Sequence, residues 1–157
     1  MNNSDKRVDS ASKIIKASPQ SIYKALVDPE AIKVWKPPQG MRCHIYEFNG
    51  EEGGLYRMAF EYDDTSISGK TSANADIFTG QFLELITDKK VVEKVNFESD
   101  KPEFAGAMTI TTELETVPGG TKVTFSAEDV PEGITPEDHN EGMMSSLNNL
   151  AAFTEGV

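Results

Sequence analysis

Large apolar and aromatic side chains recur at every second position of one segment, and they are the strongest sign of a binding site in this sequence. The even positions of residues 55–62 are Tyr56, Met58, Phe60 and Tyr62. The odd positions include the charged residues Arg57 and Glu61. A period of two is typical of a β-strand with one buried face. Because aromatic and methionine side chains suit an adaptable apolar pocket, this strand predicts a cavity for a small apolar or amphipathic molecule.

Further large side chains are expected to line the same cavity from other strands and from a C-terminal helix. They are Trp35, His44, Tyr46, Phe48, Phe82, Met143, Met144 and Leu147. Trp35 is expected at the cavity mouth. A single face of the strand at residues 41–48 is expected to carry His44, Tyr46 and Phe48. The alternative is that all these side chains form an ordinary hydrophobic core without a ligand.

Nucleophilic catalysis has little support. Cys43 and His44 are adjacent, and adjacent residues of a strand point to opposite faces of the sheet. Cys43 and His139 can meet only through the tertiary fold, so we favour an inert cysteine and two ordinary histidines. A cyclase or hydrolase acting in the cavity stays an alternative, with His44 as its best acid–base candidate. The sequence favours a protein that is not an enzyme, and no catalytic residue is predicted.

The sequence predicts no metal site and no cofactor. Its histidines and cysteine lack ligand spacing, and residues 63–69 lack the alternating acids of a calcium loop. It contains no G-x-G-x-x-G motif, no P-loop and no nucleophile elbow. Arg42 and Arg57 could hold an anionic head group if their strands are neighbours. We favour the simpler interpretation, cross-strand ion pairs with Glu47 or Glu61.

The charge of the chain is strongly negative and unevenly distributed. The 157 residues include 15 basic and 26 acidic residues, for a net charge of −11. Residues 98–157 carry a net charge of −10, from 12 acidic and two basic residues. Nucleic acid and anionic lipid surfaces are therefore poor partners. The acidic third is either a solvated face or a surface that meets a basic protein partner.

Cysteine content and the apolar runs predict a cytoplasmic protein. A single cysteine cannot form an intramolecular disulfide. The polar residues 1–7 predict a flexible N-terminus without a signal peptide. No apolar run approaches the roughly 20 residues that a membrane span needs. We expect one domain over residues 8–155.

The order of the expected elements indicates an α+β fold. A strand at residues 8–17 precedes two short helices, which Ser18-Pro19 and Asp28-Pro29 begin. A polar loop is expected at residues 63–70, and Thr135-Pro136 begins a long C-terminal helix. The remaining strands are expected at residues 41–48, 55–62, 71–85, 90–97, 108–116 and 121–128. A curved antiparallel sheet gripping the long helix would bury every apolar face.

Six local patterns, in this order and spacing, carry a resemblance to a known superfamily. They are ASPQSIYKAL (17–26), DPEAIKVW (28–35), GGLYRM (53–58), GQFLEL (80–85), GGTKVT (119–124) and GMMSSLNNL (142–150). The chain resembles the START-like superfamily, also called SRPBCC or helix-grip. It looks most like the bacterial branch related to the C-terminal domain of the heat-shock chaperone ATPase activator.

The resemblance covers residues 8–155 and implies a sheet of six to seven strands around the C-terminal helix. It also implies ligand binding in a cavity or, alternatively, a role as a chaperone cofactor or stress-related interaction domain. The chain departs from the family pattern in having Met143 where tryptophan is frequent. It also departs at residues 87–90, where a proline-containing turn is frequent, and in the polar stretch 71–76.

Overall fold

The computed structural model describes residues 7–63 and 75–155. Most of the polar loop predicted at residues 63–70 lies outside the described residues. So do the first residues of the strand predicted at 71–85 and residues 1–6 of the predicted N-terminal tail.

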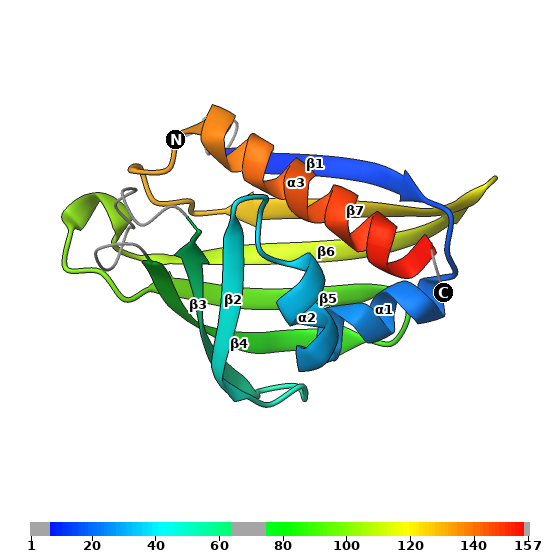
Figure 1. Ribbon diagram of the computed structural model, residues 1–157, viewed down its shortest axis with the longest axis horizontal. Coiled ribbons are helices and arrows are strands. Elements are labelled where there is room, and N and C mark those ends of the chain that lie inside the picture. Colours follow the sequence, from blue (N-terminus) through cyan, green and yellow to red (C-terminus); the bar gives the residue numbers. More distant parts are fainter. Residues whose placement is uncertain (1–6, 64–74, 156–157) are drawn as a thin grey trace, which may run out of the picture.

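A seven-stranded antiparallel sheet and three α-helices build the fold (Figure 1). The strands are β1 (Val8–Ile15), β2 (Met41–Phe48), β3 (Leu55–Tyr62), β4 (Ala75–Ile86), β5 (Lys90–Phe97), β6 (Ala107–Val117) and β7 (Gly120–Glu128). They are ordered β1-β7-β6-β5-β4-β3-β2. The helices are α1 (Pro19–Val27), α2 (Pro29–Trp35) and α3 (Pro136–Glu155), with a short 3-10 helix, η2 (Pro102–Phe104). Helix α3 crosses one face of the curved sheet, and α1 and α2 flank its C-terminal half, which confirms the predicted helix-grip fold.

Side-chain caps begin all three helices where the sequence predicts. Ser18 Oγ accepts from the backbone N–H of Ser21 at 3.1 Å, and Pro19 occupies the first helical position of α1. Asp28 caps α2 and Thr135 Oγ1 caps α3. Each cap satisfies a backbone donor that has no partner inside the helix.

The core lies between the inner face of the sheet and the helices. On β3, alternation buries Tyr56 and Met58 as predicted. On α3, Leu147 and Leu150 are fully enclosed and face the sheet. Among the described residues, no helix is both long and apolar enough to cross a membrane.

An ionic cluster fixes the start of α3 to the first strand. Asp9 is 8% exposed on β1 and accepts two hydrogen bonds from the Arg7 guanidinium, at 2.8 and 2.7 Å. Its second oxygen lies 2.7 Å from His139 Nδ1 in the first turns of α3. Arg7 also donates to the carbonyl of Ile134 at 2.6 Å, so this residue of the predicted tail is anchored. The hydrogen bonds from Arg7 hold the pKa of Asp9 below its usual value.

Candidate functional site

Most of the predicted cavity residues meet in the interior between the sheet and the helices. Six are buried: Trp35, Tyr56, Met58, Phe82, Met143 and Leu147. Phe48, Phe60 and Met144 are partly buried and contact the same core. Tyr62 is half-buried at the end of β3.

Two predicted residues, His44 and Tyr46, lie on the opposite, outer face of β2. Tyr46 is 50% exposed, and its ring contacts the His44 ring edge-on at 4.5 Å between centroids. The prediction that His44, Tyr46 and Phe48 share one face of β2 is therefore wrong. The register with β3 shifts between Ile45 and Glu47, so Phe48 turns inward while His44 and Tyr46 stay outside. His44 therefore lies outside the interior, where a cavity enzyme would need it as an acid or base.

A polar cluster, Lys36–Glu93–Tyr56, lies inside this apolar interior. Glu93 is only 7% exposed on the inner face of β5. Its Oε1 accepts a hydrogen bond from the Tyr56 hydroxyl at 2.8 Å and lies 3.5 Å from Lys36 Nζ. Burial and the charge of Glu93 raise the pKa of Tyr56 well above its usual value, so the phenol stays protonated and donates.

The sequence carries a signal for Glu93, although this residue is not among the predicted site residues. Val91, Glu93 and Val95 occupy alternate positions of a predicted strand, and all three face the core. An acidic residue at a core position of an apolar alternation indicates a polar partner or a site. Its partners, Lys36 and Tyr56, are 57 and 37 residues away in the chain, and only the fold brings them together.

Aromatic rings pack around the ring of Tyr56. Tyr56 lies opposite Gly80 on β4, and a Cβ atom at Gly80 would come within 2.1 Å of the Tyr56 ring. The Tyr56 ring lies 5.3 Å from the Phe82 ring and 6.1 Å from the Phe48 ring, measured between centroids. The glycine therefore provides the space that lets Tyr56 reach Glu93.

Helix α3 holds the loop between α2 and β2 against the molecule at the edge of the interior. Three hydrogen bonds join them: Ser146 Oγ to the Lys36 carbonyl at 2.7 Å, Asn149 Nδ2 to the Pro37 carbonyl at 3.0 Å, and Gln39 N–H to Ser145 Oγ at 2.9 Å. Trp35, predicted at the mouth, lies just inside this loop and donates from Nε1 to the Ala25 carbonyl at 2.8 Å.

The structure separates the residues of the nucleophile alternative. Burial raises the pKa of the Cys43 thiol to about 11, against the opposing charges of Lys36 and Lys33, so the thiol is protonated at neutral pH. Cys43 contacts Met58 on the neighbouring strand, whereas His139 pairs with Asp9 on β1, at the other edge of the sheet. Within residues 7–63 and 75–155, no group of three or more potential ligands could hold a metal ion.

The predicted cross-strand ion pair is confirmed for Arg42 of β2, whereas Arg57 of β3 pairs with Glu98, which follows β5, and not with Glu47 or Glu61. Arg42 lies 3.6 Å from Glu61 on the adjacent strand. Arg57 makes two hydrogen bonds to Glu98, at 2.6 and 2.9 Å, and its guanidinium lies over the Tyr46 ring.

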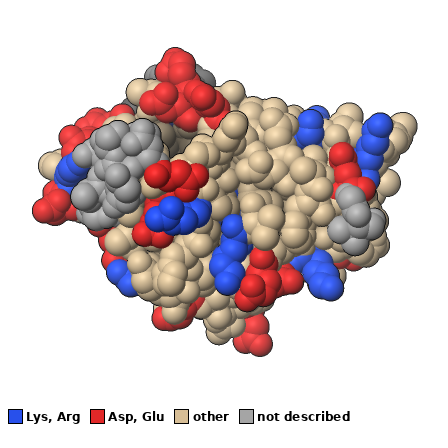
Figure 2. Space-filling view, viewed as in Figure 1, with Lys and Arg blue, Asp and Glu red and all other residues tan. Residues whose placement is uncertain are grey.

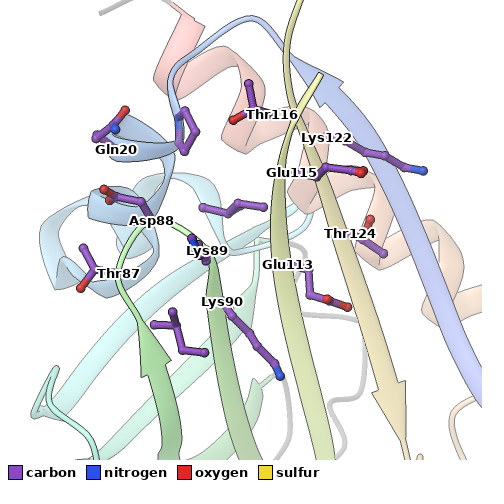
Figure 3. Close-up of a pocket in the computed structure, with 13 residues that line it drawn as sticks. Gln20, Thr87, Asp88, Lys89, Lys90, Glu113, Glu115, Thr116, Lys122 and Thr124 are labelled. Atoms are coloured by element: carbon purple, nitrogen blue, oxygen red, sulfur yellow. The ribbon is translucent and has the colours of Figure 1, made fainter. Parts of the chain in front are cut away.

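Two surface pockets lie outside the predicted cavity. The larger, of about 820 Å³, is formed by α1, the β4–β5 turn, β6 and β7 (Figure 3). Lysines and acidic residues both line it, including Lys90, which forms an ion pair with Glu84 at 3.3 Å. The smaller, of about 470 Å³, lies between α2, α3 and the start of β2. None of the predicted cavity residues lines either pocket.

Exposed acidic side chains gather at the end of the molecule where α3 begins (Figure 2). This acidic end combines η2 and its flanking loop, the end of β7, the β7–α3 loop and the first turns of α3. The η2 segment and the β7–α3 loop are joined by a hydrogen bond from Gly133 N–H to the Glu103 carbonyl. The exposed acids are Asp100, Glu103, Glu128, Asp129, Glu132, Glu137, Asp138 and Glu141.

Comparison with known proteins supports the architecture over nearly the whole chain. Residues 16–155 match the family model described as Activator of Hsp90 ATPase homolog 1-like protein. The comparison with curated proteins found no match.

Several solved bacterial structures share this fold. The crystal structure of protein CV1439 from Chromobacterium violaceum is 29% identical, with a TM-score of 0.84, and the match covers 94% of this chain and 96% of that one. A solution structure from Arthrobacter aurescens is 14% identical, with a TM-score of 0.80, over 100% and 91% of the two chains. A crystal structure from Rhodobacter sphaeroides is 17% identical, with a TM-score of 0.75, over 96% and 93%.

Proposed function

Because the chain belongs to the Activator of Hsp90 ATPase homolog 1-like family, we propose that it is a binding module that holds a small apolar or amphipathic molecule between the sheet and α3. The observation that carries this proposal is the Lys36–Glu93–Tyr56 cluster inside a largely apolar interior. Replacing a buried ion pair by well-packed apolar residues is often neutral or stabilising, so stability alone does not require one. Ligand sites, in contrast, combine apolar walls with a few polar groups that orient the ligand.

The ligand enters where the loop between α2 and β2 meets α3. Leu147 of α3 is fully enclosed against the sheet, and neither surface pocket is lined by a predicted cavity residue, so binding needs the helices to separate from the sheet. Each of the three hydrogen bonds that hold the loop contributes about 0.5–1.5 kcal/mol, so its release is accessible. The flexible side chains of Met58, Met143 and Met144 can then adapt to the ligand.

Uptake of a neutral fluorescent probe, N-phenyl-1-naphthylamine, tests this proposal. We expect the wild type to bind one equivalent with a blue shift of the emission. Met143→Trp fills the interior beside α3 and is expected to weaken binding at least tenfold. Asn148→Trp, on the exposed side of the same helix, is the matched control and should bind as the wild type does. Wild-type uptake by a folded Met143→Trp protein, or no uptake by the wild type, would contradict the proposal.

The acidic end supports a second candidate function, binding of a basic protein partner. Most of the excess negative charge of the chain lies in residues 98–157, and eight of its acids are exposed at this end. Such a surface accelerates and orients association with a basic protein, in a salt-dependent way.

A charge-neutralised variant tests this second function. The triple variant Glu132→Gln, Glu137→Gln and Glu141→Gln is expected to lose a partner that the wild type retains from cell extract at 50 mM NaCl and releases at 500 mM. The control removes three charges elsewhere, by Glu51→Gln, Glu113→Gln and Glu115→Gln, and should retain the partner. Equal retention by the two variants would argue against a role for the acidic end.

A further inference from the structure

One oxygen of the buried Glu93 carboxylate is unused. Both contacts of Glu93, with Tyr56 and with Lys36, are made by Oε1. Oε2 makes no hydrogen bond with the described residues, although the residue is more than nine-tenths buried. Over the described part of the chain, no fully enclosed side-chain oxygen or nitrogen lacks a hydrogen-bond partner. Oε2 is therefore still reachable, and a carboxylate oxygen there can accept hydrogen bonds from a bound molecule.

Lys36 shows which chemistry this position accommodates. Its ammonium group lies 3.5 Å from Glu93 Oε1 and 5.5 Å from the centroid of the Tyr56 ring. A carboxylate beside an aromatic face is a recognised arrangement for binding an ammonium ion. The Lys36 side chain is 21% exposed, and its distance to Glu93 is long for a charge-assisted hydrogen bond. The lysine is thus a weakly held occupant that a ligand can replace or join.

An anionic ligand would be repelled at this position. Its head group would face the Glu93 carboxylate at short range in a site of low dielectric constant, where repulsion between like charges is strong. The Tyr56 hydroxyl already donates its proton to Glu93, so it is not free to donate to a second anion. The cluster therefore discriminates between an amine and a carboxylate that share the same apolar chain.

We propose that the ligand is an amphipathic molecule with a protonated amine, whose ammonium group binds Glu93 beside the ring of Tyr56. The inference rests on the interior binding site proposed above. The amine approaches Glu93 more closely than Lys36 does at 3.5 Å, and the apolar part of the ligand lies among the rings and methionines under α3. A single amine at one end of the ligand fits best, because most of the remaining interior side chains are apolar.

Three probes with the same ten-carbon chain test the amine. Decylamine, decanol and decanoate are titrated by calorimetry at pH 7 and below their micelle concentrations. We expect decylamine to bind at least tenfold more tightly than the other two. Glu93→Gln, which keeps the shape of the side chain, should bring all three affinities within threefold of one another. The control Glu113→Gln removes an equal charge from an exposed position and should preserve the preference for the amine, which separates specific binding from attraction to the net charge of −11.

The outcomes distinguish the two proposals. Binding of decanol without a preference for decylamine would overturn the amine and leave the interior site standing. Absence of binding by all three probes would overturn both. A preference that persists in Glu93→Gln would also overturn the role of Glu93.

A second variant provides an independent measurement. Lys36→Met keeps the apolar stem but removes the resident ammonium group, so decylamine should bind several-fold more tightly than it binds the wild type. Unchanged or weaker binding of decylamine would overturn the assignment of Lys36 as the competing occupant.

Discussion

Asp9→Ala is expected to lower the free energy of unfolding by about 3 kcal/mol at pH 7. The substitution leaves the Arg7 guanidinium and the His139 ring without their common partner. Removing one member of a buried ionic network typically costs about 3–5 kcal/mol, and the lower end applies because the Arg7 side chain is 30% exposed. Urea unfolding followed by circular dichroism measures the change.

The loss of stability caused by Asp9→Ala should become smaller as the pH is lowered. The pKa of Asp9 is lowered in the folded protein by its hydrogen bonds with Arg7, so the ionised carboxylate stabilises the fold. This contribution is fully present above the unfolded-state pKa, about 3.9, and is lost as the pH falls through the lower folded-state pKa. The stability difference between wild type and variant should therefore be large at pH 7 and shrink below about pH 4.

A neighbouring acid provides the control for Asp9. Glu128 lies opposite Val8 in the sheet and is exposed, and Glu128→Ala should change stability by less than about 0.5 kcal/mol. An Asp9→Ala protein as stable as this control at pH 7 would show that the ionic cluster does not hold α3 to β1.

Strand and helix positions could be predicted because local signals mark both their ends. Alternation between a glycine-rich turn and a polar loop places β3 at residues 55–62, and the structure confirms those bounds. Cap residues followed by proline mark the starts of all three helices, also as predicted. The short helix η2 was missed, because three residues carry no periodic pattern.

The interior site was predicted only in part, because its decisive contacts are not local. The aromatic face of β3 follows from alternation, whereas the shift of register between Ile45 and Glu47 follows from pairing with β3 and places Phe48 on the opposite face from His44 and Tyr46. Likewise, Glu93 could be recognised as a core position in sequence, but its partners come from the residue after α2 and from β3. Residue spacing within one strand therefore predicts which faces are apolar, and the register between strands decides which polar groups meet there.

Gly80→Ala is expected to separate Tyr56 from Glu93 and to lower the free energy of unfolding by about 2 kcal/mol. The new Cβ atom would lie 2.1 Å from Cζ of Tyr56, which real contacts do not allow. The ring cannot move freely, because it is 2% exposed and packs against Phe78 and Phe82. Overpacking of this kind typically costs about 1–3 kcal/mol. The proposed amine site should lose affinity for decylamine in the same variant, because the hydroxyl that orients the carboxylate is displaced.

Gly142→Ala makes the same glycine-to-alanine change but is expected to raise the free energy of unfolding. Gly142 lies inside α3 with no atom from outside its own helix within 4 Å of a Cβ atom. Alanine there should raise stability by up to about 1 kcal/mol, because glycine is the poorer helix former. Thermal unfolding of both variants and the wild type measures these effects. The midpoint should fall for Gly80→Ala and rise for Gly142→Ala. Stabilisation by Gly80→Ala as well would show that the Tyr56 ring can leave its place over Gly80, and hence that its contact with Glu93 is not fixed by the sheet.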